Sequence, residues 1–182
     1  IRPDGMLYAV GARDMMTRIY EFGSVEPAFI LQDHMDSVYS VAFSQDNKYF
    51  ASGGLDRSIV LYDQEQEFKK VNVLRGHDDK IIAIKFSRDG KYIFSGGERG
   101  ELRVWDVSNS ENIETVKLDA KKPIYDIAVS PSGEYIAISS VRRDVGQEVF
   151  QTVQYPVSIY RWENNELTLI RNLLEHKKPA WA

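Results

Sequence analysis

The 182-residue sequence contains no cysteine, which excludes disulfides, thiolate zinc sites and cysteine nucleophiles. This absence fits a reducing compartment, and we expect an intracellular location, in the cytoplasm or the nucleus. The chain also lacks an excess of basic residues, with 23 Lys and Arg against 27 Asp and Glu. Its net charge of −4 disfavours direct contact with nucleic acid, since dedicated binders carry a basic face.

Long apolar runs and catalytic motifs are missing as well. No stretch approaches the length of about 20 residues that a membrane-spanning helix needs, and no signal-peptide pattern opens the chain. There is no G-x-S-x-G nucleophile motif, no glycine loop that would hold phosphate and no dinucleotide-binding fingerprint. We therefore expect no membrane span, no catalytic residue, no cofactor and no small-molecule substrate.

What the sequence does contain is a repeat with a constant spacing. Phe43 and Phe86 are 43 positions apart, and Phe86 and Val129 are again 43 positions apart, each within a similar apolar segment. A period in this range indicates a repeat architecture, in which each unit buries its apolar faces against its neighbours. Such proteins mostly bind other molecules and seldom catalyse reactions.

The period divides the chain into units of four short strands. We place a partial unit at 1–32, full units at 33–75 and 76–118, a unit with a long insertion at 119–174 and the start of another at 175–182. The strands of the second unit are predicted at 37–43, 48–53, 58–63 and 71–74. Those of the third unit are predicted at 80–86, 91–95, 101–106 and 113–118. The first unit lacks its first strand, and its remaining three strands are predicted at 6–11, 17–22 and 28–31. Period-two alternation and many β-branched residues favour strand over helix.

The first strand of each unit has an irregular apolar rhythm. Its inward-facing positions in the second unit are Val38, Val41 and Phe43, which are spaced by three and then by two. The same spacing recurs in the next two units, at Ile81, Ile84 and Phe86 and at Ile124, Ile127 and Val129. A regular strand changes face at every residue, so this rhythm predicts a β-bulge between the first two inward residues of each unit.

The fourth unit is longer than the others. Tyr62 and Trp105 are 43 positions apart, whereas Trp105 and the matching Tyr160 are 55 apart, which leaves 12 extra residues within 141–155. Apolar and polar residues alternate there around Gly146, and this pattern predicts a protruding hairpin. Loops longer than their equivalents tend to be functional or disordered.

Two dipeptides carry a family resemblance. Gly76-His77 opens the third unit, and Trp105-Asp106 closes its third strand. The degenerate equivalents in the second unit are Asp33-His34 and Tyr62-Asp63. Together with the period and the strand order, these features resemble the WD40 repeat. The resemblance implies an all-β fold, a β-propeller whose four-stranded blades surround a central channel.

We expect about four blades in this chain, as part of a larger, seven-bladed ring. Because the first residue is Ile1 rather than Met, the sequence is expected to be a piece of a longer polypeptide. An open arc of blades leaves unpaired strand edges, which invite aggregation. The alternative is a closed ring of four blades, in which the last segment supplies the first strand that the first unit lacks.

By the resemblance, a blade holds a hydrogen-bonded set of Asp, His, Ser or Thr, and Trp. The structural blade residues expected here are His34, Ser52, Asp56, Tyr62, His77, Ser95, Trp105 and Asp106. No blade has a full set in this alignment, because Tyr62 replaces Trp in the second unit and Arg99 replaces Asp in the third. Val10 and Ile138 replace Ser in the other two units.

Other recurring residues are also expected to have structural roles rather than catalytic or metal-binding ones. The three histidines His34, His77 and His176 occupy equivalent places in successive units and point into their own blades, so we expect no metal site. Serines recur in the turn after the first strand, at Ser44, Ser87 and Ser130, where no single active site would use them. The pairs Gly53-Gly54 and Gly96-Gly97 end the second strands, where a tight hairpin is expected to need backbone freedom.

Candidate partner-binding residues lie at one end of the expected channel. The bulge of each first strand should turn the following residue toward the channel mouth, at Tyr39, Ile82, Tyr125 and Trp181. Exposed aromatic residues in a concave rim are typical interface anchors, and packing between blades is the alternative. From their positions within the repeat, Lys80, Arg13, Leu55 and Glu98 should lie at the same end. On the inserted hairpin, we expect a protein partner to contact Arg142, Arg143, Phe150 and Tyr155.

These features predict a non-enzymatic protein-interaction scaffold within a larger multiprotein assembly, with proteins or peptides as its partners. One alternative is a propeller component of an RNA-processing or ribosome-assembly particle, where the net acidity disfavours direct RNA contact. Another is a regulatory propeller attached to a catalytic domain outside this segment. The fold serves too many pathways to decide between them.

Overall fold

The fold is built from short antiparallel strands. The structure is a computed structural model that describes residues 1–118, 122–140 and 157–173, and within these ranges it contains strands and no helix. The strands form four sheets, and in each sheet neighbouring strands are consecutive in the chain. This is the all-β fold that the repeat predicts.

The four sheets are numbered here in chain order. Sheet 1 contains β1 (Leu7–Gly11), β2 (Thr17–Glu21) and β3 (Phe29–Leu31). Sheet 2 contains β4 (Val38–Phe43), β5 (Tyr49–Gly54), β6 (Ser58–Asp63) and β7 (Lys69–Arg75). Sheet 3 contains β8 (Ile81–Phe86), β9 (Tyr92–Gly97), β10 (Glu101–Asp106) and β11 (Asn112–Lys117). Sheet 4 contains β12 (Ile124–Val129), β13 (Tyr135–Ser140), β14 (Val157–Glu163) and β15 (Glu166–Leu173).

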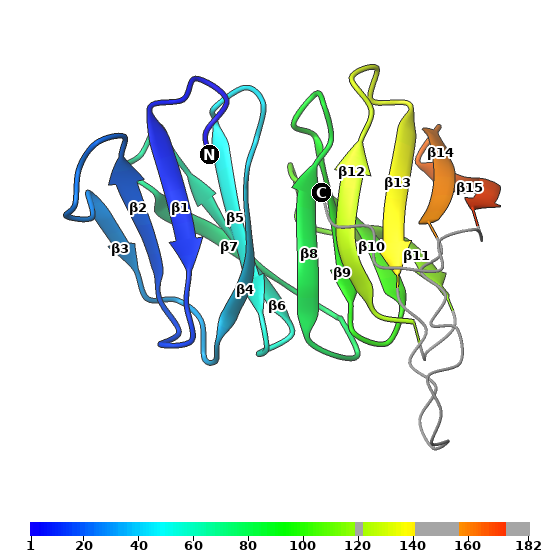
Figure 1. Cartoon of the computed structure of the whole chain (residues 1–182), viewed down its shortest axis with the longest axis horizontal. Helices are drawn as coiled ribbons and strands as arrows, with labels where there is room; N and C mark the ends of the chain where they lie inside the picture. Colours follow the sequence, from blue (N-terminus) through cyan, green and yellow to red (C-terminus); the bar gives the residue numbers. More distant parts are fainter. Residues whose placement is uncertain (119–121, 141–156, 174–182) are drawn as a thin grey trace.

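The sheets stand side by side in chain order, like blades (Figure 1). The first strands β4, β8 and β12 are neighbours in space, with β4 in contact with β8 and β8 in contact with β12. Sheet 1 joins the row through contacts between β1 and β4. The observed strands match the predicted ranges to within two residues at each end in the first three units.

The core lies between the sheets. One apolar cluster joins sheets 1 and 2, where Ile19 and Phe50 are both fully buried. A second cluster joins sheets 2 and 3, and a third joins sheets 3 and 4. Because full burial of a side chain of this size stabilises a fold by about 1.5–3 kcal/mol, each sheet is held mainly by its neighbours. This is the packing expected of propeller blades.

The predicted bulges are present in all three complete sheets. In sheet 2, Val38 pairs with Gly54 and Ser40 pairs with Gly53, so Tyr39 is the extra residue. The same shift between Ile81 and Ala83 and between Ile124 and Asp126 makes the extra residues Ile82 and Tyr125. The three-then-two rhythm therefore reflects a real change of face within each first strand.

A side-chain hydrogen bond explains the serine that recurs after each first strand. The hydroxyl of Ser44 accepts a hydrogen bond of 2.8 Å from the backbone N–H of Tyr49 and so closes the turn between β4 and β5. Ser87 and Ser130 make the equivalent bonds in sheets 3 and 4, each at 3.0 Å. These serines thus fix the end of the sheets that is opposite to the bulges.

The glycine pairs have a different role from the expected one. All four glycines lie within β5 or β9, and none has a positive φ, so backbone freedom is not what they provide. A Cβ atom at Gly53 would lie 2.5 Å from Cδ1 of Ile84, and one at Gly96 would lie 2.3 Å from Cγ2 of Ile124. The first glycine of each pair therefore makes room for the first strand of the next sheet.

Candidate protein-binding rim

The loops at the bulged end of sheet 2 are tied together by a buried histidine. His34 lies before β4, and its Nδ1 is 2.9 Å from Oδ2 of Asp56 while its Nε2 is 2.8 Å from Oγ of Ser52. Asp56 also accepts a hydrogen bond from the backbone N–H of Met35. Burial acts to raise the pKa of Asp56, but the hydrogen bonds from Met35, Ser58 and His34 outweigh it and lower the pKa below its usual value.

Sheet 3 contains the same arrangement with a different carboxylate. Nε2 of His77 lies 2.7 Å from Oγ of Ser95, which also accepts a hydrogen bond of 2.8 Å from Nε1 of Trp105. Nδ1 of His77 lies 3.0 Å from Oε2 of Glu101. The expectation that no blade has a full set is therefore wrong for sheet 3. Glu101 supplies the carboxylate that Arg99 cannot, because its longer side chain reaches back from β10.

The buried carboxylate of Glu101 is held by several donors. It accepts a hydrogen bond of 2.9 Å from the Arg103 guanidinium and one of 3.1 Å from the backbone N–H of Asp78. Burial acts to raise the pKa of Glu101, but these bonds and the adjacent His77 lower it below its usual value. Burial lowers the pKa of His77 to about 4 despite the adjacent carboxylate, so the ring is neutral at pH 7.

The remaining structural positions form no such network in the described residues. Tyr62 is 1% exposed, and burial raises the pKa of its hydroxyl. Asp106 accepts a hydrogen bond of 2.8 Å from the backbone N–H of Ser108 and so closes a turn. In sheet 1, Asp14 forms a surface ion pair of 2.6 Å with Arg18. In sheet 4, Ile138 is a fully buried core residue.

We call the bulged end of the sheets the rim, and its described candidate residues are Arg13, Tyr39, Leu55, Lys80, Ile82, Glu98 and Tyr125. The extra residue of each bulge is displaced from the core. Tyr39 is 49% exposed and Tyr125 is 38% exposed, whereas the preceding Val38 and Ile124 are buried. Ile82, between the two tyrosines in the row of first strands, is half-buried.

Three of the predicted rim residues are brought together across sheets 2 and 3. Nζ of Lys80 lies 2.9 Å from Oε2 of Glu98 and 5.9 Å from the ring centre of Tyr39. The hydrogen bond to Glu98 raises the pKa of Lys80. A cation this close to an aromatic face is attracted to it. The Lys80–Tyr39 contact therefore joins the bulge of one blade to the loop of the next.

The other predicted residues fall into two groups. Arg13 is exposed and lies in the loop after β1, and Leu55 is half-buried and lies in the loop after β5. The residues outside the described ranges are Trp181, Arg142, Arg143, Phe150 and Tyr155, and the predicted hairpin lies there too. Sequence reasoning missed Asp79, whose carboxylate lies 3.1 Å from Nε of Arg99 at the rim.

Neither a metal cluster nor a membrane-crossing helix is found in the described ranges. Among residues 1–118, 122–140 and 157–173, no group of three His, Cys, Asp or Glu side chains is placed to hold a metal ion. Across the same residues, no helix is long and apolar enough to span a bilayer. The two described histidines each bond to a carboxylate and a serine of their own sheet.

The sequence profile described as "WD domain, G-beta repeat" matches residues 25–63 and 68–106. These two segments contain β5, β6, β9 and β10, together with both histidine networks. Residues 25–63 and 68–106 are WD40 repeats. The WD40 repeats also contain the bulged strands β4 and β8, and therefore the rim residues Tyr39 and Ile82.

Curated relatives share these repeats over limited lengths. The Intraflagellar transport protein 122 homolog of Danio rerio is 37% identical over 68 residues, which is 36% of this chain and 6% of that protein. The Homo sapiens protein of the same name is 34% identical over 68 residues, or 5% of its length. The 66 kDa stress protein of Physarum polycephalum is 28% identical over 142 residues, which is 77% of this chain and 20% of that protein. The chain therefore matches at most 20% of the length of these relatives.

Proposed function

We propose that this protein is a non-enzymatic WD40 scaffold that binds other proteins or peptides through the rim, as part of a larger intracellular assembly. The observation that carries the proposal is the exposure of Tyr39 and Tyr125 at the same end of different blades. A bulge in each first strand turns these side chains out of the core. Tyrosine is enriched at interface anchors because it combines a large apolar ring with a polar tip.

The arrangement around the two tyrosines supports this reading of the rim. The Lys80–Glu98 ion pair is partly exposed beside Tyr39, so polar groups flank an apolar centre. Protein interfaces commonly have such an apolar core with a polar margin. The inserted segment at 141–155 remains a proposed second contact, through Arg142, Arg143, Phe150 and Tyr155.

The similarity to these relatives supports a role as a WD40 scaffold, and it does not identify the pathway in which the scaffold works. The name Intraflagellar transport protein 122 homolog belongs to proteins that share 68 residues with this chain. A transport assembly is one setting in which such a scaffold would work, but the shared part is the repeat itself. Fold-level likeness does not assign a pathway.

The proposal is tested by comparing the proteins that bind the wild-type protein and its variants in quantitative affinity capture. The double variant Tyr39→Ala/Tyr125→Ala is expected to lose specific partners by about tenfold or more, as for anchor residues of an interface. The matched control is Tyr135→Ala, because Tyr135 is 41% exposed but starts β13 at the opposite end. Equal capture by the wild type and both variants would contradict the proposal.

A further inference from the structure

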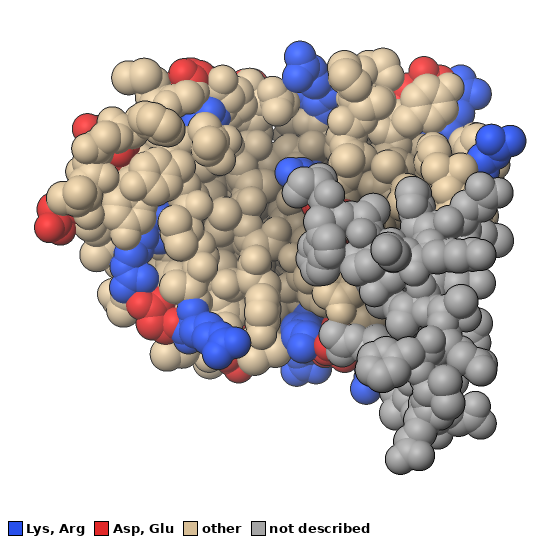
Figure 2. Space-filling view, viewed as in Figure 1, with Lys and Arg blue, Asp and Glu red and all other residues tan. Residues whose placement is uncertain are grey.

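Three of the four methionines of the chain lie in loops of the rim. Met15 and Met16 belong to the turn between β1 and β2, and Met35 lies between β3 and β4. The two loops are hydrogen-bonded to each other, because the hydroxyl of Ser37 donates to the carbonyl oxygen of Arg13 over 3.4 Å. This end is the lower margin of the molecule in Figure 2, where acidic and basic side chains are also gathered. The methionines therefore add apolar groups to a rim that carries many charges.

The three methionines differ in how far solvent reaches them. Met35 is 79% exposed and Met15 is 46% exposed, whereas Met16 is half-buried. The sulfur of Met16 also accepts a hydrogen bond of 3.4 Å from the guanidinium of Arg18 and one of 3.5 Å from the side-chain amide of Gln32. These donors occupy the weak acceptor sites of that sulfur. Met15 and Met35 are therefore the thioethers of this cluster that a reagent in solution reaches most easily.

The repeat does not require a methionine at either exposed place. Asp78 lies 43 positions after Met35, at the equivalent place in the next blade. Met15 has a φ of 69°, and its equivalents are Arg57 in sheet 2, with a φ of 62°, and Gly100 in sheet 3, with a φ of 69°. Glycine suits this left-handed conformation best, and no packing between the sheets calls for a long apolar side chain there. An exposed thioether at each place is therefore a feature of this chain rather than of the repeat.

We propose that hydrogen peroxide oxidises Met15 and Met35 and thereby weakens the binding of proteins to the rim, an inference that rests on the proposed function of the rim. In each reaction, hydrogen peroxide transfers one oxygen atom to the thioether sulfur, the O–O bond breaks and water leaves. The sulfur is oxidised by two electrons, and the peroxide is reduced. The resulting sulfoxide turns a flexible apolar side chain into a polar one, so a partner loses apolar contact with the rim.

The fold itself should not depend on the state of these two sulfur atoms. Met35 contributes to the histidine network through its backbone N–H, which donates to Asp56, and this bond involves no sulfur. Its side chain and that of Met15 are exposed, and surface changes usually alter the free energy of unfolding by about 0.5 kcal/mol or less. Oxidation is therefore expected to change the surface of the rim and to leave the sheets intact.

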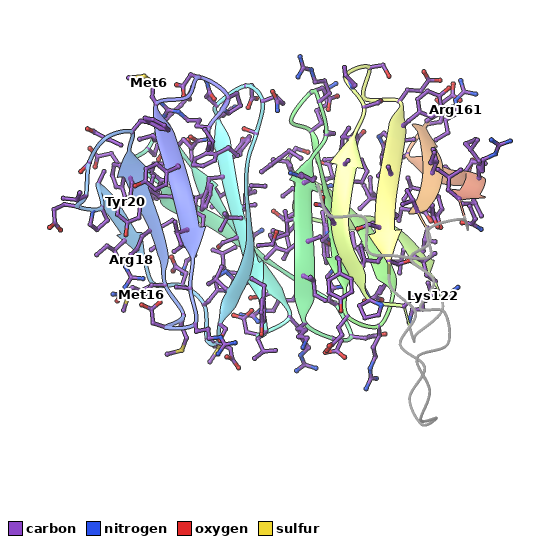
Figure 3. All side chains as sticks on the ribbon, in the orientation of Figure 1. Met6, Met16, Arg18, Tyr20, Lys122 and Arg161 are labelled. Carbon is purple, nitrogen blue, oxygen red and sulfur yellow. The ribbon has the colours of Figure 1, made fainter. Side chains whose placement is uncertain are left out.

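The first measurement follows sulfoxide formation by peptide mass spectrometry during limited treatment of the protein with hydrogen peroxide. Met15 and Met35 are expected to react about fivefold or more faster than Met16, because Met16 is half-buried and its sulfur is hydrogen-bonded. Met6 provides the control, since it is 62% exposed and lies at the opposite end of sheet 1 from Met16 (Figure 3). It should react as readily as Met35 without any effect on the rim.

The second measurement compares quantitative affinity capture by treated and untreated protein, after catalase has removed the peroxide so that the captured proteins are not oxidised. Treatment is expected to lower capture by the wild type about fivefold or more. The variant Met15→Leu/Met35→Leu keeps apolar side chains of similar size but cannot form a sulfoxide, so its capture should survive treatment. The matched control Met6→Leu should lose capture on treatment as the wild type does.

Three results would overturn the inference. Met16 that reacts as fast as Met35 would show that burial and hydrogen bonding do not select the oxidised sulfurs. Capture by the wild type that treatment leaves unchanged would show that the sulfoxides do not matter for binding. An equal loss in Met15→Leu/Met35→Leu would place the sensitive group elsewhere. The tyrosine variant Tyr39→Ala/Tyr125→Ala separates the two proposals, because a loss on oxidation that the leucine variant prevents supports the methionine site even where the tyrosine variant loses nothing.

Discussion

Glu101 shows how a single side chain can restore a network that an alignment appears to break. It lies at the position of Ser58 in the previous blade, two residues after the place where the shorter Asp56 lies. Its carboxylate is 5% exposed and meets His77, Arg103 and the backbone of Asp78. The sequence alone identified His77, Ser95 and Trp105 but not Glu101, because side-chain reach across a turn is not a property of the repeat spacing.

The first prediction concerns this carboxylate. Glu101→Gln is expected to lower the free energy of unfolding by about 1–3 kcal/mol, because the Arg103 guanidinium loses its charged partner in a buried site. Urea denaturation measures the change. The matched control is Arg99→Gln, since Arg99 is 69% exposed in its ion pair with Asp79 and should cost about 0.5 kcal/mol or less. An equal loss in both variants would show that Glu101 is not a structural anchor.

The second prediction is a dependence of stability on pH. The pKa of His77 is about 4 in the folded protein and 6.5 as an unperturbed side chain. Between these values the unfolded chain binds more protons, so stability should fall as the pH falls from about 6.5 to about 4. The lowered pKa of Glu101 acts in the same direction below its usual value of 4.5.

The size of this effect is at most about 3 kcal/mol for His77, on the scale of 1.36 kcal/mol for each pKa unit. Urea midpoints at about pH 7 and about pH 5 measure it. His77→Gln removes the titrating group, so the variant should be less stable at neutral pH and should show a smaller difference between the two conditions. The same difference in wild type and variant would place the titration elsewhere.

At the scale of the elements, the first strands explain most of the sequence pattern. The three-then-two rhythm predicted each bulge, because inward residues must reach the same core from a strand that alternates its faces. The role of Gly53 and Gly96 was not predictable from the same pattern. Their constraint comes from Ile84 and Ile124 of the next sheet, and local turn chemistry contains no information on that distance.

The third prediction tests this contact. Gly96→Ala is expected to destabilise the protein by about 1–3 kcal/mol, because its Cβ atom would lie 2.3 Å from Cγ2 of Ile124 and the two sheets would have to move apart. The control is Thr168→Ala, an exposed position within β15. Thermal unfolding of both variants measures the difference. An unchanged midpoint for Gly96→Ala would show that the space between sheets 3 and 4 is not tight.

At the scale of the whole molecule, the row of sheets has two unequal ends. Figure 3 places Arg18 and Tyr20 of sheet 1 at one end and Arg161 of sheet 4 at the other. On the outward face of sheet 1, Tyr8 and Tyr20 stack with ring centres 5.0 Å apart, and Val10 is 46% exposed. The period predicted the stacking of blades, since apolar faces that repeat must cover one another. It also predicted about four blades in this chain, and the structure contains four sheets.

The burial of equivalent residues in sheet 2 indicates that the outward face of sheet 1 is suited to packing against another sheet. Phe50 and Tyr62 occupy the places of Tyr8 and Tyr20, and they are 0% and 1% exposed because sheet 1 covers them. Ser52, in the place of Val10, is also fully buried. A further sheet on sheet 1 would bury its face in the same way, and we expect one in the larger ring.

The last prediction follows from that expectation. If another sheet covers this face in the protein, Val10→Lys should lower the free energy of unfolding by about 2 kcal/mol or more, because it buries an unpaired charge. Val71→Lys is the control, since Val71 is 51% exposed on the outer strand β7, where a lysine is well tolerated. Urea denaturation of both variants decides the matter. Losses that agree within about 0.5 kcal/mol would mean that the face meets water and that no further blade packs there.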